Sequence, residues 1–235
     1  MKDLGGKPVI LRTYEAAVNT KLFDTVYVVT DSTVIYDAIV SAGGQAIMSV
    51  KEHSCGSDRI AEAVADLDID IVVNVQGDEP LIPPQNIEKV VEPLIKDTSV
   101  SVTSLRILIQ NPKDIFNNNI TKVVVDKFDS ALYFSKAPIP WDRDTWPVNM
   151  DEALNLSAPL WFKHIGLYAY RKKFLMEYSA LPVSPLEKVE KLEQLRILEN
   201  GFSIKVVETK LDSTGVDSES DIEIIEKQLA LFPDN

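Results

Sequence analysis

The sequence has almost no cysteine, few histidines and no long apolar run. Cys55 is the only cysteine among 235 residues, so no disulfide can form within the chain, and a reducing, cytoplasmic compartment is expected. No stretch approaches the ~20 apolar residues that span a bilayer, and residues 1–6 contain no apolar signal-peptide core. The two histidines are not spaced with each other or with the cysteine as zinc ligands are, so no zinc site is expected.

Basic residues are also scarce. Lys and Arg number 24 against 36 Asp and Glu, which gives a formal net charge of −12. Nucleic acids and anionic membrane surfaces attract basic proteins, so neither is expected as a partner. Hydrophobic residues make up 45% of the chain, which is ordinary for a folded globular protein. An acidic protein can still bind anionic small molecules through a local basic pocket or a bound divalent cation.

Helix and strand patterns alternate along the first third of the chain. Amphipathic stripes predict helices over residues 9–18, 32–40 and 57–67, and β-branched runs predict strands over 25–30, 45–48 and 71–75. This alternation is typical of βαβ units. It predicts an α/β fold with a mostly parallel sheet flanked by helices.

The pattern changes after residue 99. Successive strand patterns at 99–109, 121–126 and 131–134 predict a mixed or antiparallel section, followed by a long loop over 138–159. Further patterns predict a strand at 162–170, an amphipathic helix at 186–198, a strand at 202–207 and a closing helix after a capping box at 218–221. We predict a single domain over 1–235, with a small β-rich arm or dimerisation element around 110–160.

The turn at residues 75–80 is the sharpest chemical feature. Asp78 and Glu79 follow a predicted buried strand, and ligands of open α/β sheets bind beyond the carboxyl ends of strands. Carboxylate oxygens at such a position suit Mg²⁺, which is usually held by one or two carboxylates together with substrate phosphates. An acidic β-turn with no ligand is the alternative interpretation.

Other candidate residues each have a plain structural alternative. Asp217 would complete a metal site if it lay beside Asp78, or it would simply cap a helix. His164 alternates with apolar residues in a strand, where a structural histidine is common. The segment from Ser57 to Arg59 enters a predicted helix at its N-terminus. The backbone N–H groups there could bind an anion, or the segment could simply be an ordinary helix cap.

Glu193 and Gln194 fall in the middle of the predicted helix over 186–198. Local pattern alone favours a solvated helix face that is rich in charge pairs.

Short segments occur in a fixed order along nearly the whole chain. They are Gly6-Lys7-Pro8, Val29-Thr30-Asp31, Gly56-Ser57-Asp58-Arg59, residues 73–80, Ala131-Leu132-Tyr133-Phe134-Ser135, Ile139-Pro140-Trp141-Asp142-Arg143, residues 164–168, Ser184-Pro185-Leu186-Glu187, residues 192–196 and Thr214-Gly215-Val216-Asp217. In this order they resemble the 3-deoxy-manno-octulosonate (KDO) cytidylyltransferase family, also called CMP-KDO synthetases. The turn at 76–80 and the segment at 140–143 are its most specific motifs.

The resemblance implies a Rossmann-like nucleotide-diphospho-sugar transferase fold and a reaction. The anomeric hydroxyl of KDO attacks the α-phosphate of CTP, pyrophosphate leaves, and CMP-KDO forms for lipopolysaccharide biosynthesis. The resemblance also implies Mg²⁺ as cofactor and a homodimer. Carried over residue by residue, it implies metal binding and catalysis by Asp78 and Asp217. It implies a KDO pocket formed by Gln76, Arg143, His164, Tyr168, Glu193 and Gln194, and nucleotide binding by Ser57, Arg59 and Asp78.

The chain departs from the family at its start. Members of the family begin with a strand and a basic, glycine-containing loop that wraps the CTP phosphates, and neither precedes Met1 here. Lys7 matches the following segment and does not inherit the role of the phosphate-binding lysine. The missing strand would be central, so its loss would leave neighbouring strands unpaired. The chain as written is therefore expected to turn over CTP poorly. A sialic-acid-activating synthetase and a non-catalytic nucleotide- or sugar-binding remnant remain as alternatives.

Overall fold

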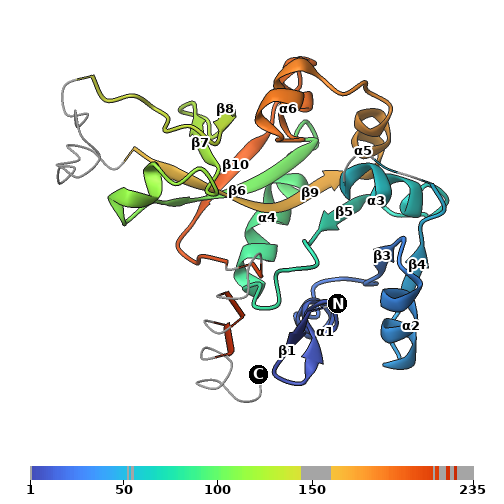
Figure 1. Cartoon of the computed structure of the whole chain (residues 1–235). Coiled ribbons are helices and arrows are strands. Elements are labelled where there is room, and N and C mark those ends of the chain that lie inside the picture. The colour runs from blue at the N-terminus through green and yellow to red at the C-terminus, as the bar shows by residue number, and fades with distance from the viewer. Residues whose placement is uncertain are drawn as a thin grey trace.

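The computed structural model describes residues 2–51, 53, 56–143, 160–213, 215–216, 221–222 and 225–226 (Figure 1). The strands are β1 (Asp3–Leu4), β2 (Lys7–Pro8), β3 (Val28–Thr30), β4 (Ala46–Met48), β5 (Ile71–Asn74), β6 (Val102–Leu108), β7 (Lys122–Val125), β8 (Ala131–Ser135), β9 (Phe162–Arg171) and β10 (Lys205–Thr209). The helices are α1 (Val9–Asn19), α2 (Thr33–Ser41), α3 (Gly56–Val64), α4 (Pro84–Lys96), α5 (Lys172–Ser179), α6 (Pro185–Glu190) and α7 (Leu195–Glu199), with a 3₁₀ turn at Pro112–Ile115.

Strand β9 organises the main sheet (Figure 1). It spans 10 residues and pairs antiparallel with β6 along most of its length. Its other edge pairs with β7 near Phe162 and with β5 near Tyr170, so one long strand joins the arm to the α/β body. Strand β8 extends the arm beyond β7, and β10 runs parallel to β6 at the far edge.

The sheet is mixed, which corrects the expected predominance of parallel pairing. Within the described chain, β3–β4 and β6–β10 are the parallel ladders, whereas β9 runs antiparallel to each of its three neighbours. The physical reason is that β9 enters the sheet from the arm and inserts between strands that run the other way. The α/β class itself is confirmed.

Helices cover both faces of the main sheet. On one face, α4 packs its apolar stripe, which includes Ile87, Val90 and Leu94, against β6 and β9. On the other face, α3, α5 and α7 enclose a core that includes Tyr170, Leu175 and the side chains of β5 and β10. Truncating one of these buried aliphatic side chains to Ala typically costs about 2–5 kcal/mol.

Strands β3 and β5 each have a partner on one side only in the described part of the chain. Strand β3 pairs with β4, and β5 pairs with β9. A cavity of about 150 Å³ lies between them, under α1. Apolar side chains and exposed polar atoms both contribute to its lining, which comprises Ile10, Thr13, Tyr14, Ala17, Phe23, Thr25, Val26, Tyr27, Val28, Val29, Val75 and Gly77. Helix α1 therefore directs its buried face at an open space between two strand edges.

Three helical regions differ from the sequence-based expectations. Helices α4 and α5 were not predicted, because Pro84 and Pro93 and a short charged stretch obscure their patterns. The helix expected at 186–198 is two helices, α6 and α7, because Lys191 adopts a left-handed conformation with φ 57° and ends α6.

The remaining expectations concern the arm, the ends and the whole-chain organisation. The β7–β8 hairpin lies within the predicted arm, while residues 144–159 fall outside the described residues. Of the closing helix, positions 221–222 and 225–226 are described and are helical. The single-domain division stays a prediction. No helix in the described ranges combines the length and apolarity needed to cross a bilayer.

Candidate active site

The turn after β5 is held in place from two sides. The Glu79 N–H donates to the Gln76 carbonyl at 3.1 Å, which closes the turn. The Thr13 hydroxyl, from α1, donates to the Gly77 carbonyl at 3.0 Å. The N–H of Val216 donates to the Asp78 carbonyl at 2.9 Å, so the segment near the C-terminus lies directly against the turn. The turn is thus a rigid junction between three parts of the chain that are far apart in sequence.

Carboxylate and carbonyl oxygens gather beside Gly215. A Cβ placed on Gly215 would lie 3.7 Å from each of three oxygens, namely the carbonyl oxygen and Oδ2 of Asp78 and Oε1 of Glu79. Burial raises the pKa of Glu79, and the negative charge of Asp78 adds to that shift against a hydrogen bond from Ser213. The two adjacent carboxylates repel each other, and a hard divalent cation bound between their oxygens would relieve this repulsion.

Asp217 lies outside the described residues, so its distance from Asp78 stays a prediction. Its described neighbours Gly215 and Val216 contact Asp78. Among the described residues, no group of three or more His, Cys, Asp or Glu side chains comes together as a metal site. The donors present, hard oxygens on adjacent carboxylates, still fit Mg²⁺, which commonly takes only one or two carboxylates from the protein.

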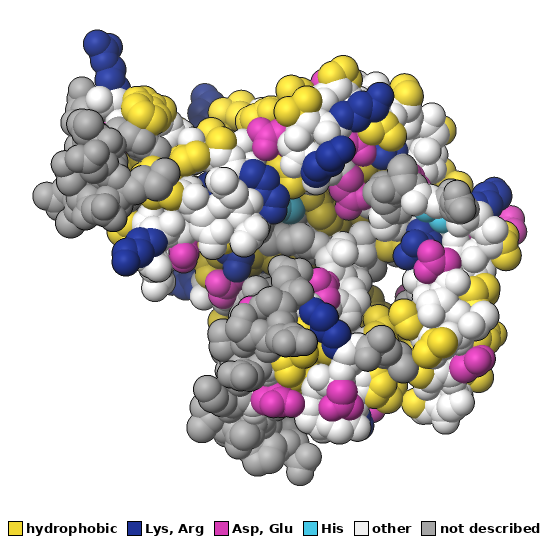
Figure 2. Space-filling model, in the orientation of Figure 1, with side chains coloured by type: hydrophobic (Ala, Val, Ile, Leu, Met, Phe, Trp, Pro, Cys, Tyr) yellow, Lys and Arg dark blue, Asp and Glu magenta, His cyan; other side chains and the backbone are white. Residues whose placement is uncertain are grey.

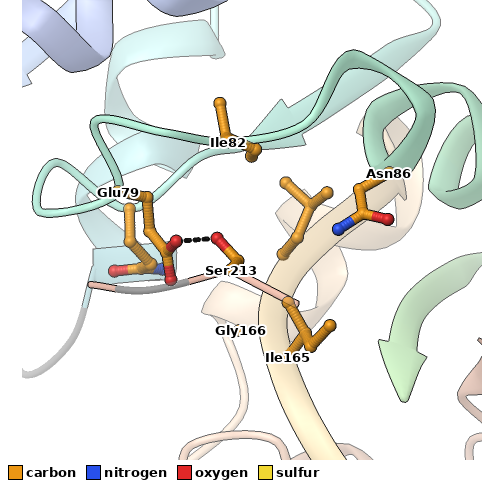
Figure 3. Close-up of a pocket in the computed structure, with 8 residues that line it drawn as sticks. Glu79, Ile82, Asn86, Ile165, Gly166 and Ser213 are labelled. Atoms are coloured by element: carbon orange, nitrogen blue, oxygen red, sulfur yellow. Dashed lines mark hydrogen bonds between the residues drawn. The ribbon is translucent and has the colours of Figure 1, made fainter. Parts of the chain in front are cut away.

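A small pocket opens beside this turn (Figure 3). Glu79 and Ser213 face each other across one end of it and are joined by a hydrogen bond. Ile165 and Gly166 of β9 form another wall, with Ile82 and Asn86 opposite. Gln76 lines the same pocket, and a Cβ on Gly166 would lie 4.0 Å from its Cγ. The structure therefore brings Gln76 to the β9 segment that carries His164 and Tyr168.

His164 is buried and hydrogen-bonded in β9. Its Nε2 atom lies 2.8 Å from the Ser104 hydroxyl, and its ring contacts Phe134 and Tyr168 at centroid distances of 4.9 and 5.4 Å. Burial lowers the pKa of His164 to about 3, and the positive charge of Lys136 acts in the same direction. The imidazole is therefore neutral at physiological pH and offers hydrogen bonds rather than charge.

Stacked tyrosines extend from His164 towards the nucleotide-side residues. Tyr168 stacks on Tyr170 at 5.7 Å between centroids, and the Tyr170 hydroxyl lies 3.4 Å from that of Ser57 at the start of α3. Ser57 is fully buried, so it has little surface to offer a ligand directly. Arg59 is partly buried and its Nη2 donates to Asp31 at 3.1 Å, while its Nε is buried without a partner.

Glu193 and Gln194 lie at the break between α6 and α7, and not on a solvated helix face. That alternative is wrong, because Gln194 is buried and the Glu193 Oε2 atom is buried with no hydrogen-bond partner. The Glu193 carbonyl accepts a hydrogen bond from the Tyr178 hydroxyl at 3.1 Å. Burial raises the pKa of Tyr168 well above its usual value, and the charges of Tyr170 and Glu193 act in the same direction. A buried carboxylate oxygen without a hydrogen-bond partner is rare in folded proteins, and a ligand hydroxyl is one group that could satisfy it.

A buried ion pair fixes this break. The Arg196 guanidinium donates from Nε and Nη2 to the two oxygens of Glu187 at 2.8 and 2.7 Å, and from Nη1 to Asp58 at 3.2 Å. Glu187 in turn accepts from the Ser184 N–H, which completes a capping box at the start of α6. Arg196 thereby ties α7 to α6 and α3 around Glu193.

The structure separates the predicted site residues into three groups. Gln76 lies beside β9, which carries the neighbouring rings of His164 and Tyr168, while Glu193 and Gln194 lie at the α6–α7 break. Ser57 connects to this group through Tyr170. Arg143 is exposed at the last described position before residues 144–159, and no contact in the described chain ties it to the pocket.

Sequence reasoning missed Ser104, Arg196 and Ser213. Ser104 is one of two adjacent hydroxyl residues in β6, beside Thr103, and Arg196 is a charge within an apolar helix pattern. The polar residues Ser104 and Arg196 stand out in the sequence, but only the tertiary structure shows which residues they contact.

Comparisons with known proteins define the class. A family model described as cytidylyltransferase matches residues 1–209. The 3-deoxy-manno-octulosonate cytidylyltransferase of Christiangramia forsetii is 51% identical over 232 residues, which cover 98% of this chain and 90% of the relative. The enzyme of the same name from Flavobacterium johnsoniae is 53% identical over 225 residues, which cover 95% and 88%. This chain therefore belongs to the 3-deoxy-manno-octulosonate cytidylyltransferase family of cytidylyltransferases, as the sequence motifs indicated.

Solved structures agree. A CMP:2-keto-3-deoxy-manno-octonic acid synthetase complexed with CTP superposes with a TM-score of 0.85 at 35% identity, covering 98% of this chain and 90% of that one. A 4-diphosphocytidyl-2C-methyl-D-erythritol synthase from Anaerococcus prevotii gives a TM-score of 0.59 at 16% identity, which shows a shared fold alone. The predicted nucleotide-diphospho-sugar transferase fold is confirmed.

Proposed function

We propose that this chain transfers CMP from CTP to the anomeric hydroxyl of KDO. The hydroxyl oxygen forms a bond to the α-phosphorus, the bond from that phosphorus to the pyrophosphate oxygen breaks, and the hydroxyl proton leaves to solvent. The products are CMP-KDO, for lipopolysaccharide biosynthesis, and pyrophosphate. The observation that carries the proposal is the match, over 98% of this chain, to a synthetase solved with CTP. Gln76, beside β9, and the neighbouring rings of His164 and Tyr168 on β9 support it.

The side chains of this pocket suit a hydroxyl-rich acidic sugar. Gln76, Gln194 and neutral His164 offer hydrogen-bond donors and acceptors, and the Glu193 Oε2 atom is an acceptor that a sugar hydroxyl would satisfy. The hydroxyl of buried Tyr168 stays protonated and is therefore a donor at neutral pH. Such groups orient the attacking hydroxyl, and positioning is the main requirement of phosphoryl-type transfer.

Asp78 and Asp217 are proposed to hold Mg²⁺, with Ser57 and Arg59 on the nucleotide side. The Asp78 oxygens that lie beside Gly215 support the role of Asp78. When bound, Mg²⁺ neutralises phosphate charge and orients the oxygens of CTP. The partners proposed are CTP, KDO and a second copy of the chain in a homodimer within the cytoplasm. Figure 2 shows acidic and basic side chains interspersed over one face, without the broad basic field that nucleic-acid binding uses.

Pyrophosphate release tests the function. The assay contains CTP, Mg²⁺ and KDO, with sialic acid in a parallel arm and Asp78→Ala as the inactive control. The assay is run on two proteins. One is the chain from Met1, and the other is a chimaera. In the chimaera, the N-terminal residues of the Flavobacterium johnsoniae relative that lie before its matched segment are added ahead of Met1. KDO-dependent release that needs Asp78 supports the proposal. Release with sialic acid alone contradicts the sugar assignment, and CTP binding without any release from either protein supports the non-catalytic alternative.

A further inference from the structure

The contact between Ser104 and His164 determines how the imidazole is presented. Ser104 is fully buried in β6 at a shift in the β6–β9 register. Thr103 pairs with Ala169 whereas Leu105 pairs with Ile165, so residues 166–168 of β9 lie opposite Ser104 alone. Bulges of this kind interrupt the ladder and redirect side chains, and they are common next to active sites.

The Ser104 hydroxyl contacts three atoms of the bulged strand. Its Oγ lies 3.1 Å from the Ile165 carbonyl oxygen, 3.0 Å from the Leu167 carbonyl oxygen and 2.8 Å from Nε2 of His164. The two carbonyls can only accept hydrogen bonds, and the hydroxyl has a single proton. An imidazole nitrogen can either donate or accept, so His164 is the flexible member of the group.

Only one arrangement makes all three contacts favourable. If the hydroxyl proton went to Nε2, both carbonyl oxygens would face the Ser104 oxygen with no proton between them in a buried site, which is costly. If the hydroxyl donates to the carbonyls, Nε2 must carry the proton and donate to Oγ. The remaining ring nitrogen, Nδ1, is then an acceptor, and no described residue donates to it.

We propose that Ser104 is a positioning residue that holds His164 as the neutral Nε2–H tautomer, so that Nδ1 accepts a hydrogen bond from a hydroxyl of the bound sugar. The proposal rests on the proposed function for its ligand, whereas the tautomer itself depends on the Ser104 geometry alone. Phe134 and Tyr168 contact the ring and limit its rotation, so the hydroxyl selects the proton position while the aromatic contacts fix the plane.

Nitrogen-15 NMR of histidine-labelled protein tests the tautomer directly. The chain has two histidines, so His53→Gln assigns both ring systems. The wild-type chain should show His164 protonated only at Nε2 near neutral pH. Ser104→Ala should convert it to a tautomer mixture, and Ser104→Thr, which keeps the hydroxyl, should preserve it. A wild-type His164 protonated at Nδ1 would overturn the proposal.

The matched control is Thr103→Val. Thr103 is equally buried, is adjacent in β6, and donates its hydroxyl to the Val90 carbonyl and not to His164. This variant removes a buried hydroxyl from the same strand and should leave the His164 signals unchanged. If Thr103→Val also produced a tautomer mixture, the effect of Ser104→Ala would come from a general loosening of β6, and the specific role of Ser104 would be wrong.

A KDO titration followed by the same signals tests the sugar contact. KDO should shift the Nδ1 resonance of His164 and not those of His53, and Ser104→Ala should weaken KDO binding about 3- to 10-fold, as expected for one lost hydrogen bond. CTP binding should change less than twofold. If KDO binds without moving Nδ1, the sugar contact is wrong. If KDO does not bind at all, the proposed function fails, while the tautomer result still decides whether Ser104 controls His164.

Discussion

The backbone N–H of Val216 donates to the carbonyl of Asp78 at 2.9 Å, across 138 positions of sequence (216 − 78). This hydrogen bond anchors the segment that leads into Asp217 against the turn after β5. Asp217 itself lies outside the described residues, so its pairing with Asp78 stays a proposal that variants must test.

The first prediction concerns this carboxylate pair. In the KDO-dependent assay, Asp78→Asn and Asp217→Asn should each lower turnover at least ~10²-fold, because losing a metal ligand removes several kcal/mol of charge stabilisation. The double variant should be little worse than either single one, since residues that act as a unit are not additive. Asp212→Asn is the control, because Asp212 is exposed and pairs with Lys163 at 2.9 Å. Wild-type turnover by Asp217→Asn would remove Asp217 from the site.

The second prediction concerns stability in acid. The pKa of His164 has its ordinary value of 6.5 in the unfolded chain, and burial lowers this pKa to about 3 in the folded protein. Between these values the unfolded state binds more protons. The contribution of this residue is therefore complete above pH 6.5 and is lost as the pH falls towards 3.

Urea unfolding at about pH 5 and pH 7 measures this effect. One such group changes the free energy of unfolding by at most ~1.4 kcal/mol per pH unit. His164→Gln should reduce the loss of unfolding free energy between pH 7 and pH 5. His53→Gln is the matched control at the other histidine, which pairs with Glu62 at 2.7 Å. Equal slopes in the wild-type chain and in His164→Gln would contradict the assignment.

The turn after β5 could be predicted because its sequence pattern is local; its role in metal binding stays a prediction. A strand that is followed by a turn with Gly77, Asp78 and Glu79 predicts this feature from neighbouring residues alone, so the mixed pairing of the sheet did not affect the prediction. Glu193 was different. Its environment depends on Lys191, whose left-handed backbone ends α6, and apolar periodicity carries no information about a single residue in that conformation.

Contacts between residues on neighbouring strands could not be predicted from the local sequence pattern either. Ser104 reads as an ordinary strand residue, and its role arises only from the register shift opposite Gly166. The antiparallel course of β9 similarly reflects its entry from the arm. The order of the motifs predicted the family, which hydrophobic periodicity alone could not do. The motifs did not predict how the strands pair.

The third prediction concerns the buried ion pair behind the pocket. Arg196→Met should lower the free energy of unfolding by about 3–5 kcal/mol, because it leaves the Glu187 carboxylate buried without its bidentate partner. It should also weaken KDO binding, since Glu193 sits on the break that Arg196 fixes. Lys7→Met, which breaks an exposed pair with Glu15, should cost less than ~1 kcal/mol and leave binding unchanged. An Arg196→Met protein as stable as the wild-type chain would show that the pair is not structural.

The last prediction concerns β3 and β5, each of which has one strand partner in the described part of the chain. A strand placed between them could pair with both and cover apolar side chains under α1, which include Ile10, Val29 and Val75. The chimaera described above should therefore unfold at a higher urea concentration, with a gain of about 2 kcal/mol or more, because burying a single Val or Leu side chain contributes ~1.5–3 kcal/mol. It should also release pyrophosphate faster than the chain from Met1.

Two variants of the chimaera separate strand insertion from other causes of this gain. A proline in the middle of the added segment should abolish it, because proline cannot donate to a ladder between two strands. Ala17→Phe should also abolish it, because Ala17 lines the cavity from the buried face of α1 and the larger ring would occupy the space of the strand. If the gain survives both changes, the added residues act elsewhere and the cavity does not hold a strand.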